Sequence, residues 1–217
     1  MIAIPAVTES EFMRLILASA SPRRRELLTQ AGFEFTIESP DINEEPLPHE
    51  SAAAYVQRLA VEKAEAICAL HRGVEAEPFT VLAADTCVVS DGIILGKPVD
   101  AADARRMLAL LAGRTHAVMT GVAAVHSPGL SAAIRSVADV EITQVTFDLV
   151  TEGEIARYVA SGEPLDKAGA YAIQGYAARW IPRIEGDYFN VVGLPLSRMV
   201  RLLDEVQDAA VAANPTK

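Results

Sequence analysis

Residues 15–28, LILASASPRRRELL, predict a buried strand that turns directly into a helix. Leu15–Ala18 is an uninterrupted apolar run, Ser21 is a favoured helix N-cap, and Pro22 suits the first helical position. Arg23–Arg25 then occupy the first helical turn, where the helix dipole makes each cation unfavourable by about 0.3–1 kcal/mol. A phosphate bound by the free backbone N–H groups of the turn would compensate these charges. A solvated arginine face is the alternative, and the segment by itself does not decide between the two.

Two charged residues interrupt apolar segments farther along the chain. Ser51 predicts the start of a helix that runs to about His71, and Lys63 falls in the middle of its apolar stripe. Such a lysine either extends to the surface or reaches into a polar cleft. The apolar run Val81–Ala84 ends at Asp85, and a buried carboxylate is costly unless it is paired or binds a metal. An ion pair that serves packing alone is the structural alternative for this carboxylate.

Turn and cap signals place the other elements. Asp91-Gly92 predicts a type I′ turn between strands at 88–90 and 93–95, the first of which resumes the apolar strand after an interruption at 85–86. Gly96-Lys97-Pro98 follows, with the lysine between two residues that break regular structure. The other expected strands are a half-buried strand at 33–37 and strands at 115–125, 135–147 and 180–184. The other expected helices are one capped by Asp100 and ended by Gly113, a short one with a Thr151–Glu154 capping box, and a last one at 195–206. An irregular segment is expected at 164–179.

The composition limits the class of ligand and the cellular location that we expect. With 217 residues, 51% of them hydrophobic, the chain has ample core, and its net charge of −10 argues against general nucleic-acid binding. The arginines therefore favour a small, local anion. Cys68 and Cys87 fit neither a disulfide framework nor a metal cluster. No apolar run reaches the ~18 residues of a membrane span, and we expect no secretion signal at the N-terminus. We expect a cytoplasmic protein without a nucleic-acid or membrane partner, with a loose extension at 1–13, a single domain at 14–206 and a flexible tail at 207–217.

Seven residues carry the chemistry that these patterns suggest. They lie at element ends, in interrupted loops or on apolar faces, which is where sites are built. Cations clamp phosphates, and carboxylates hold a divalent metal or activate water, so together they suggest phosphoryl or pyrophosphate hydrolysis. Unrelated surface charges are the alternative. The seven residues are Arg23, Arg24, Glu44, Lys63, Asp85, Lys97 and Gln174.

Six motifs occur in order between about Leu15 and Leu203: LASASPRR, INEE, VEKA, AADT, LGKP and EPLDKAGAYAIQG. Each motif is weak alone, but their order makes the pattern specific. The set resembles the Maf family of nucleoside triphosphate pyrophosphatases, once described as septum-formation inhibitors. IQG in the last motif resembles the subgroup that acts on dTTP and UTP, whereas the subgroup that prefers 7-methyl-GTP differs in that segment.

The resemblance implies a mixed α/β fold, in which a twisted sheet is flanked by helices and two lobes surround a central cleft, similar to the inosine-triphosphate pyrophosphatases. It implies that Asp85 is the proton acceptor. Three further positions would affect substrate choice, namely Arg23, Thr86 and Gln174. The other cleft residues that it implies are Ser19, Arg24, Glu44, Lys63 and Lys97. One departure is Asn43, where the family commonly has an acidic residue, so Asn43 is not among the candidate metal ligands.

These residues suggest a mechanism in which Mg²⁺ or Mn²⁺, held by Glu44 and Asp85, polarises the phosphoryl oxygens of a bound triphosphate. Arg23 and Arg24 would neutralise the triphosphate together with the two lysines, and Gln174 would meet the donor and acceptor edge of thymine or uracil. The expected products are a nucleoside monophosphate and pyrophosphate. The resemblance is also compatible with a homodimer. A nucleotide-binding regulator of cell division without catalysis is the alternative function, and a phosphatase that releases orthophosphate is a third.

Overall fold

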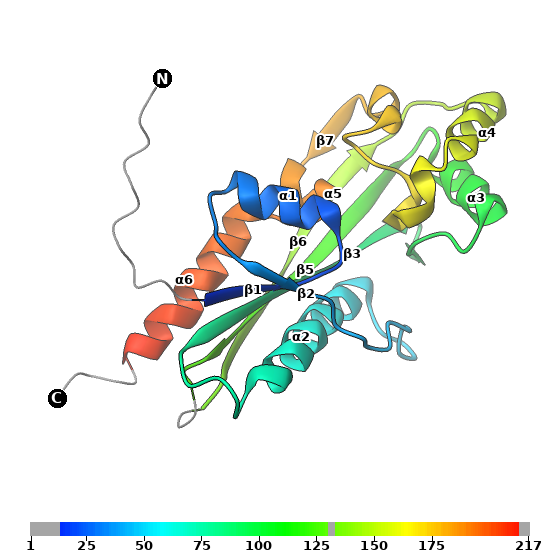
Figure 1. Ribbon diagram of the computed structural model, residues 1–217. Helices are drawn as coiled ribbons and strands as arrows, with labels where there is room; N and C mark the ends of the chain where they lie inside the picture. Colours follow the sequence, from blue (N-terminus) through cyan, green and yellow to red (C-terminus); the bar gives the residue numbers. More distant parts are fainter. Residues whose placement is uncertain (1–13, 130–132, 213–217) are drawn as a thin grey trace, which may run out of the picture.

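A seven-stranded mixed sheet forms the centre of the computed structural model, which describes residues 14–129 and 133–212 (Figure 1). The strand order is β2-β1-β3-β5-β6-β7, with β4 paired to the end of β3. β1 pairs in parallel with β2 and β3, and all the other pairs are antiparallel. The strands are β1 (Arg14–Ala18), β2 (Thr36–Glu38), β3 (Phe79–Ser90), β4 (Ile93–Leu95), β5 (Thr115–Ser127), β6 (Arg135–Thr146) and β7 (Arg183–Glu185).

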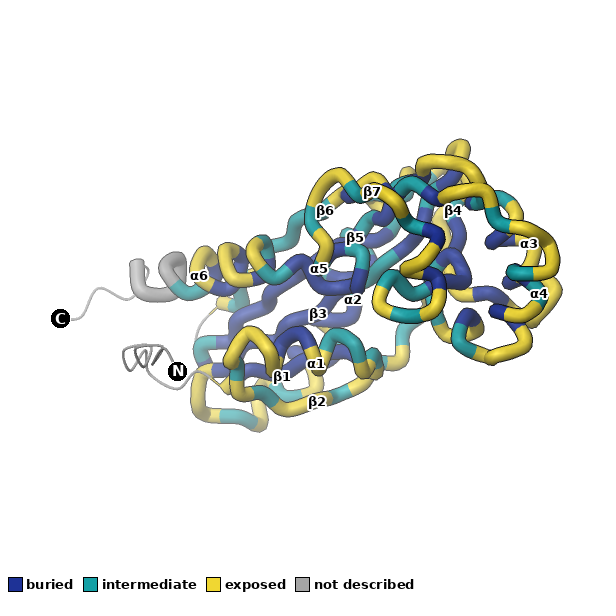
Figure 2. The backbone as a smooth tube through the Cα atoms, turned by 90° about the horizontal axis from the view of Figure 1, so that it is seen from above, coloured by how far each residue is buried: buried dark blue, intermediate teal, exposed yellow. Residues whose placement is uncertain are grey.

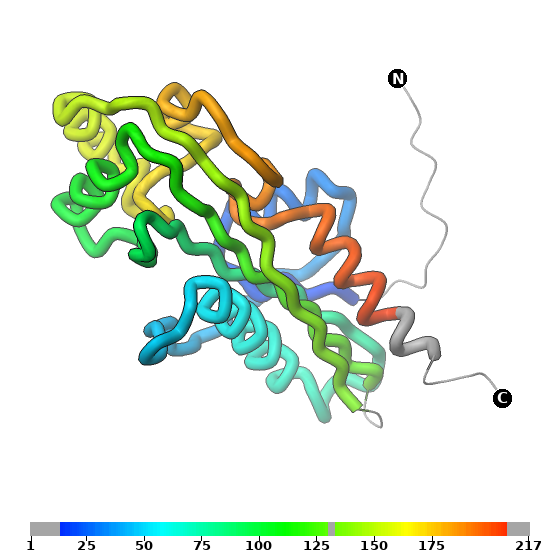
Figure 3. The backbone as a smooth tube through the Cα atoms, turned by 180° about the vertical axis from the view of Figure 1, so that it is seen from behind, coloured from blue at the N-terminus to red at the C-terminus, as the bar shows by residue number. Residues whose placement is uncertain are grey.

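Helices cover both faces of the sheet and one of its ends. α1 and α6 pack on one face and α2 packs on the other, while α3 and α4 lie where β5 begins and β6 ends (Figure 1, Figure 3). Three short 3-10 turns, η1 to η3, lie between α4 and β7 along the chain. The helical elements are α1 (Pro22–Gln30), α2 (Ala52–His71), α3 (Ala101–Leu111), α4 (Glu152–Ala160), η1 (Glu163–Asp166), η2 (Ala168–Ala170), η3 (Tyr176–Trp180), α5 (Tyr188–Val192) and α6 (Leu196–Ala212).

Three apolar clusters give the molecule two lobes. Leu28 and Met199 belong to the cluster between the sheet and α1 and α6, and Ile67 belongs to the cluster under α2 on the opposite face. Leu108 and Trp180 belong to the third cluster, which fills the lobe that holds α3 and α4. The buried backbone follows the central strands, and the outer turns of the helices are exposed (Figure 2). The predicted mixed sheet flanked by helices is confirmed.

Local sequence signals account for most element ends. Asp91 and Gly92 both have positive φ, as the predicted type I′ turn between β3 and β4 requires. The capping box at the start of α4 is also formed as predicted. All four expected N-caps accept a hydrogen bond from the backbone N–H three residues on, and these are Ser21, Ser51, Asp100 and Thr151.

The expected break in β3 is wrong. The strand continues through Asp85–Thr86 and keeps its register with β5 along that stretch. A lysine from α2 supplies a counter-charge for the Asp85 carboxylate, so the carboxylate can lie in a central strand without ending it. The sequence pattern could not show this partner, because it lies 22 residues away in the chain.

Three other expected boundaries also differ. The half-buried strand at 33–37 is replaced by β2, a three-residue edge strand that is largely exposed and pairs only with β1. β7 begins at Arg183 rather than at 180, because η3 occupies 176–180. α6 continues to Ala212, past the expected end at 206.

Residues 1–13, which hold the expected N-terminal extension, and residues 213–217 of the expected tail lie outside the described residues. In the part of the chain that the structure describes, no helix has both the length and the apolar character that crossing a membrane requires.

Gly121 of β5 sets how closely α2 approaches the sheet. A Cβ atom at this position would overlap the carbonyl group of Val56 in α2. Only glycine therefore allows the helix backbone to lie directly on the strand. This close approach brings the middle of α2 against β3 and β5, where the charged residues described next are found.

Candidate active site

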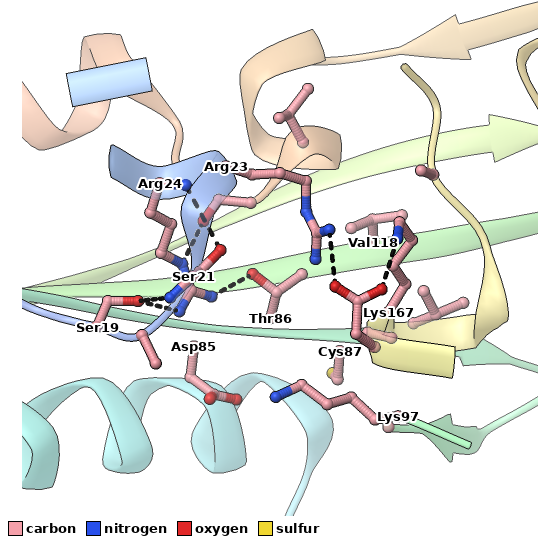
Figure 4. A pocket seen from close by; sticks show the side chains of 18 of the residues that line it. Ser19, Ser21, Arg23, Arg24, Asp85, Thr86, Cys87, Lys97, Val118 and Lys167 are labelled. Carbon is pink, nitrogen blue, oxygen red and sulfur yellow. Dashed lines mark hydrogen bonds and ion pairs between the residues drawn. The ribbon is translucent and has the colours of Figure 1, made fainter. Parts of the chain in front are cut away.

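The three arginines in the first turn of α1 have different surroundings, and Figure 4 shows two of them, Arg23 and Arg24. The guanidinium of Arg23 reaches the carboxylate of Asp166 at 3.4 Å. Arg24 turns inward, and the N-cap Ser21 accepts a hydrogen bond from the Arg24 backbone N–H at 3.5 Å. Arg25 is exposed. Two of the three cations therefore face the interior of the molecule, and the third is the solvated one.

Arg24 is held by the turn just before its own helix and by two segments that are distant in sequence. Its Nε donates to the Gly193 carbonyl at 2.8 Å, and its two Nη atoms donate to Thr86 Oγ1 at 3.0 Å and to Ser19 Oγ at 3.4 Å. Burial lowers the pKa of the guanidinium, and the nearby Asp85 charge partly opposes this. The turn after β1, the middle of β3 and the end of α5 therefore meet at a single side chain.

Lys63 joins the two carboxylates that the sequence singles out. The residue is 8% exposed, and its Nζ lies 2.6 Å from Asp85 Oδ1 and 2.6 Å from Glu44 Oε1. The lysine therefore reaches into a polar cleft rather than extending to the surface. Burial by itself raises the pKa of Glu44, but the hydrogen bond and charge of Lys63, with smaller effects from Lys97 and Arg24, leave the Glu44 pKa lowered.

An ion-pair bridge links α1 to the opposite lobe. Asp166 in η1 lies 3.4 Å from the Arg23 guanidinium and 2.5 Å from Lys167 Nζ (Figure 4). Lys167 also donates to the backbone carbonyl of Glu163 at 2.6 Å. The irregular segment at 164–179 thus brings a further cation to the site, which the list of sequence candidates does not include.

These groups line a cleft of about 550 Å³ between the two lobes. Lys167 and four predicted cations face three carboxylates there, Glu44, Asp85 and Asp166, so the cleft carries excess positive charge in a chain whose net charge is −10. Every residue that the sequence assigns to catalysis, substrate or metal lines this cleft: Ser19, Arg23, Arg24, Glu44, Lys63, Asp85, Thr86, Lys97 and Gln174.

Sequence reasoning missed several neutral groups of the cleft wall. Tyr55 donates its hydroxyl to the Glu44 backbone carbonyl at 2.9 Å, and burial, helped by the Asp85 and Glu44 charges, raises its pKa to about 12. Burial, followed by the charge of Asp85, raises the pKa of the Cys87 thiol to about 12 as well. Both groups are therefore protonated at neutral pH. Tyr55 shares a helix face with Lys63, which is the signal that could have indicated it.

The carboxylates suit a divalent cation that keeps phosphate and water ligands. Glu44 and Asp85 present hard oxygen donors around the same ammonium group. Mg²⁺ is usually held by one or two carboxylates together with substrate phosphates, so this donor set fits. Among the described residues, no group of three or more His, Cys, Asp or Glu side chains converges as a metal cage. Any metal here would therefore take part of its coordination from the ligand.

The fold and the cleft together define a class of protein. A mixed α/β protein that gathers five cations around an ion-paired carboxylate between two lobes is built to bind a small polyanion beside a carboxylate. Residues 14–206 match the family described as Maf-like protein, and the chain belongs to this family.

Curated relatives cover nearly the same length. A dTTP/UTP pyrophosphatase from Hahella chejuensis is 50% identical over 192 residues, which are 88% of this chain and 92% of that protein. One from Moorella thermoacetica is 51% identical over 190 residues, 88% and 93% of the two chains. One from Myxococcus xanthus is 50% identical over 190 residues, 88% and 91% of the two chains.

Among solved structures, a nucleoside-triphosphatase / dITP/XTP pyrophosphatase from Mycobacterium abscessus is similar at 16% sequence identity. The match covers 94% of this chain and 98% of that chain, with a TM-score of 0.41. A likeness at this level carries no argument about the site.

Proposed function

We propose that this chain hydrolyses nucleoside triphosphates, dTTP and UTP in particular, to the nucleoside monophosphate and pyrophosphate. The observation that carries the proposal is the meeting of Arg23, Arg24, Lys63 and Lys97 around the Asp85 carboxylate in a single cleft. Curated relatives about 50% identical over 88% of the chain, each named dTTP/UTP pyrophosphatase, support the same activity.

Binding of the triphosphate rests on four cations from three segments. Arg23 and Arg24 present guanidinium groups at the N-terminus of α1, where backbone N–H groups also favour an anion. Lys63 from α2 and Lys97 from the segment after β4 approach as point charges. Together they neutralise the charge that builds on the phosphoryl oxygens.

Asp85 acts as the general base in this proposal. It accepts a proton from the attacking water, and Lys63 holds the carboxylate in place through the 2.6 Å ion pair. A Mg²⁺ or Mn²⁺ ion held by Glu44 and Asp85 would supply Lewis-acid polarisation of the phosphoryl oxygens. Gln174 offers both a donor and an acceptor to the N3–H and carbonyl edge of thymine or uracil.

A panel of nucleoside triphosphates tests the proposal. With Mg²⁺ present, dTTP and UTP are expected to release pyrophosphate, while 7-methyl-GTP and the purine nucleotides release much less. R24A should lose at least about tenfold in kcat/KM, because it removes a charged donor from the cleft. R25A is the matched control and should keep wild-type activity, since Arg25 is exposed.

The other outcomes of the panel discriminate between functions. Release of orthophosphate would indicate a phosphatase of another type. Tight nucleotide binding without release of any product would favour a regulatory nucleotide-binding protein of cell division. A cytoplasmic location and a homodimer are further parts of the proposal, to be checked by cell fractionation and by light scattering.

A further inference from the structure

A buried threonine on β5 lies directly behind the cleft. Thr120 is 0% exposed and is the register partner of Thr86 across the antiparallel β3–β5 pair. The two hydroxyl oxygens are 2.9 Å apart. Thr120 does not line the cleft, so it has no direct access to a ligand bound there.

The direction of the hydrogen bond between these hydroxyls follows from a third contact. Thr120 Oγ1 also lies 3.2 Å from the backbone carbonyl of Asn190 in α5. A carbonyl oxygen can only accept, so the single hydroxyl proton of Thr120 goes to Asn190. Thr120 must then accept from Thr86, and the proton of the Thr86 hydroxyl points away from the cleft into the sheet.

This direction fixes what Thr86 can do in the cleft. With its proton committed to Thr120, its oxygen presents only lone pairs, and one of them accepts from Arg24 Nη at 3.0 Å. Thr86 is therefore an acceptor that orients a guanidinium, not a donor to a phosphate oxygen. The Arg24 Nε bond to the Gly193 carbonyl, just after α5, gives the guanidinium a second fixed point.

We propose that Thr120 is a positioning residue for nucleotide binding. It sets the direction in which the Thr86 hydroxyl donates its proton, and so holds the Arg24 guanidinium facing inward, where it can donate hydrogen bonds to an anion. The kinetic consequence of this inference rests on the proposed function. The hydrogen-bond relay, by which we mean the chain of hydrogen bonds from the Asn190 carbonyl to Arg24, does not rest on it. The chain of contacts runs from the Asn190 carbonyl through Thr120 and Thr86 to Arg24.

Two conservative variants distinguish the role of the Thr120 hydroxyl group from the role of the side chain in packing. T120V keeps the volume but removes the hydroxyl, and it should lower kcat/KM for dTTP about tenfold, mainly through KM, because the anchoring of a charged donor is weakened. T120S keeps the hydroxyl and should remain within about twofold of wild type. Equal losses in T120V and T120S would overturn the proposal, because packing rather than the relay would then be responsible.

A control and a double mutant test the route of the effect. T143V removes another buried hydroxyl that bonds to the α5 segment, through the Asp187 carbonyl and the Asn190 side chain, but does not touch Thr86. It should lower stability and leave kcat/KM near wild type. If Thr120 acts through Thr86, T120V should add no loss in a T86V background. A loss in T143V equal to that in T120V, or additive losses in the double mutant, would each overturn the proposal.

Hydrogen exchange of the Arg24 side chain does not depend on enzymatic turnover. It therefore tests the hydrogen-bond relay even if the proposed function is wrong. In ¹⁵N-labelled protein, the Nη protons of Arg24, assigned with an R24K variant, should exchange with solvent faster in T120V than in wild type or T120S. Unchanged exchange in T120V contradicts the relay. Wild-type protein that releases no pyrophosphate from any nucleotide contradicts the proposed function instead, and leaves this comparison as the test of Thr120.

Discussion

Lys63 occupies a position on the apolar face of α2 that no isolated helix would favour. It is tolerated because Glu44 and Asp85 each lie 2.6 Å from its ammonium group. The Asp85 pair is largely removed from solvent, with 10% and 13% of the two side chains exposed, whereas Glu44 is half exposed. Removing one partner of a buried pair leaves a charge without compensation, at a cost of about 3–5 kcal/mol. At this position Glu44 remains as a second partner, which limits that cost.

Replacing Asp85 tests the proposed base. D85N should lower kcat for dTTP hydrolysis by about 10²-fold or more, because an amide cannot accept the proton of the attacking water. The fold should survive, since Lys63 keeps its ion pair with Glu44. Steady-state kinetics and a thermal melt check both parts. D91N serves as control, because Asp91 lies in an exposed turn where asparagine also tolerates the positive φ of 50°. An active D85N enzyme would remove Asp85 from the role of base.

At the scale of elements, the site depends on how closely helices approach the central strands. α2 rests on β5 at Gly121, and this contact sets the distance between the helix and the neighbouring strand β3 that carries Asp85. α1 and the end of α5 are joined by the Arg24 bond to Gly193. Two helix positions therefore determine where Arg23, Arg24 and Lys63 lie, whereas Lys97 and Lys167 come from the segments after β4 and η1.

A methyl group at Gly121 should push α2 away from the sheet. G121A is expected to lower the free energy of unfolding by about 1–3 kcal/mol or more, because the overlap is with backbone that cannot rotate away. It should also lower activity, since Lys63 moves with the helix. G153A in α4 is the matched control: nothing lies within 4 Å of a Cβ there, and alanine should stabilise the helix by up to about 1 kcal/mol. Urea unfolding of both variants is the measurement, and equal stability of G121A and wild type would contradict this account of the contact.

At the scale of the whole molecule, two lobes with separate apolar clusters share the long strands β5 and β6. The lobe that holds α3 and α4 contains an aromatic cluster in which His116 packs edge-on against Phe147 and Tyr171. The His116 Nε2 lies 2.9 Å from the Tyr171 hydroxyl, and burial lowers the pKa of the histidine to about 4. Tyr171 lines the cleft, so the wall of the site depends on a histidine that stays neutral.

This buried histidine should make stability depend on pH. Its ordinary pKa is 6.5 and its folded pKa is about 4, so between these values the unfolded chain binds a proton that the folded chain does not. Stability therefore falls as the pH decreases from 6.5 to 4, by about 3 kcal/mol from this group. H116Q does not titrate and should lose that part of the pH dependence. Urea unfolding of both proteins at pH 4 to 7 is the measurement, and parallel curves would contradict the prediction.

The sequence by itself determined the local structure and the inventory of the site. The strand and helix start at 15–28, the four N-caps and the Asp91-Gly92 turn depend on neighbours in the chain, and their physical chemistry is complete within a few residues. The same is true of which charged residues interrupt apolar segments. Seven candidate residues named from these patterns, and Ser19 and Thr86 named from the family resemblance, all line one cleft.

Only the tertiary structure decided which of these groups are partners. The Lys63–Asp85 pair joins residues 22 positions apart and explains why β3 continues through that carboxylate. Two of the three anchors of Arg24, Thr86 and Gly193, lie 62 and 169 residues from it in the chain. Their geometry comes from strand register and from helix packing at positions such as Gly121. Thr120 gains its place in the same way, because no local pattern distinguishes it from other threonines until the sheet is assembled. Lys167 lies within the EPLDKAGAYAIQG motif, but only the assembly of the two lobes brings it to the cleft.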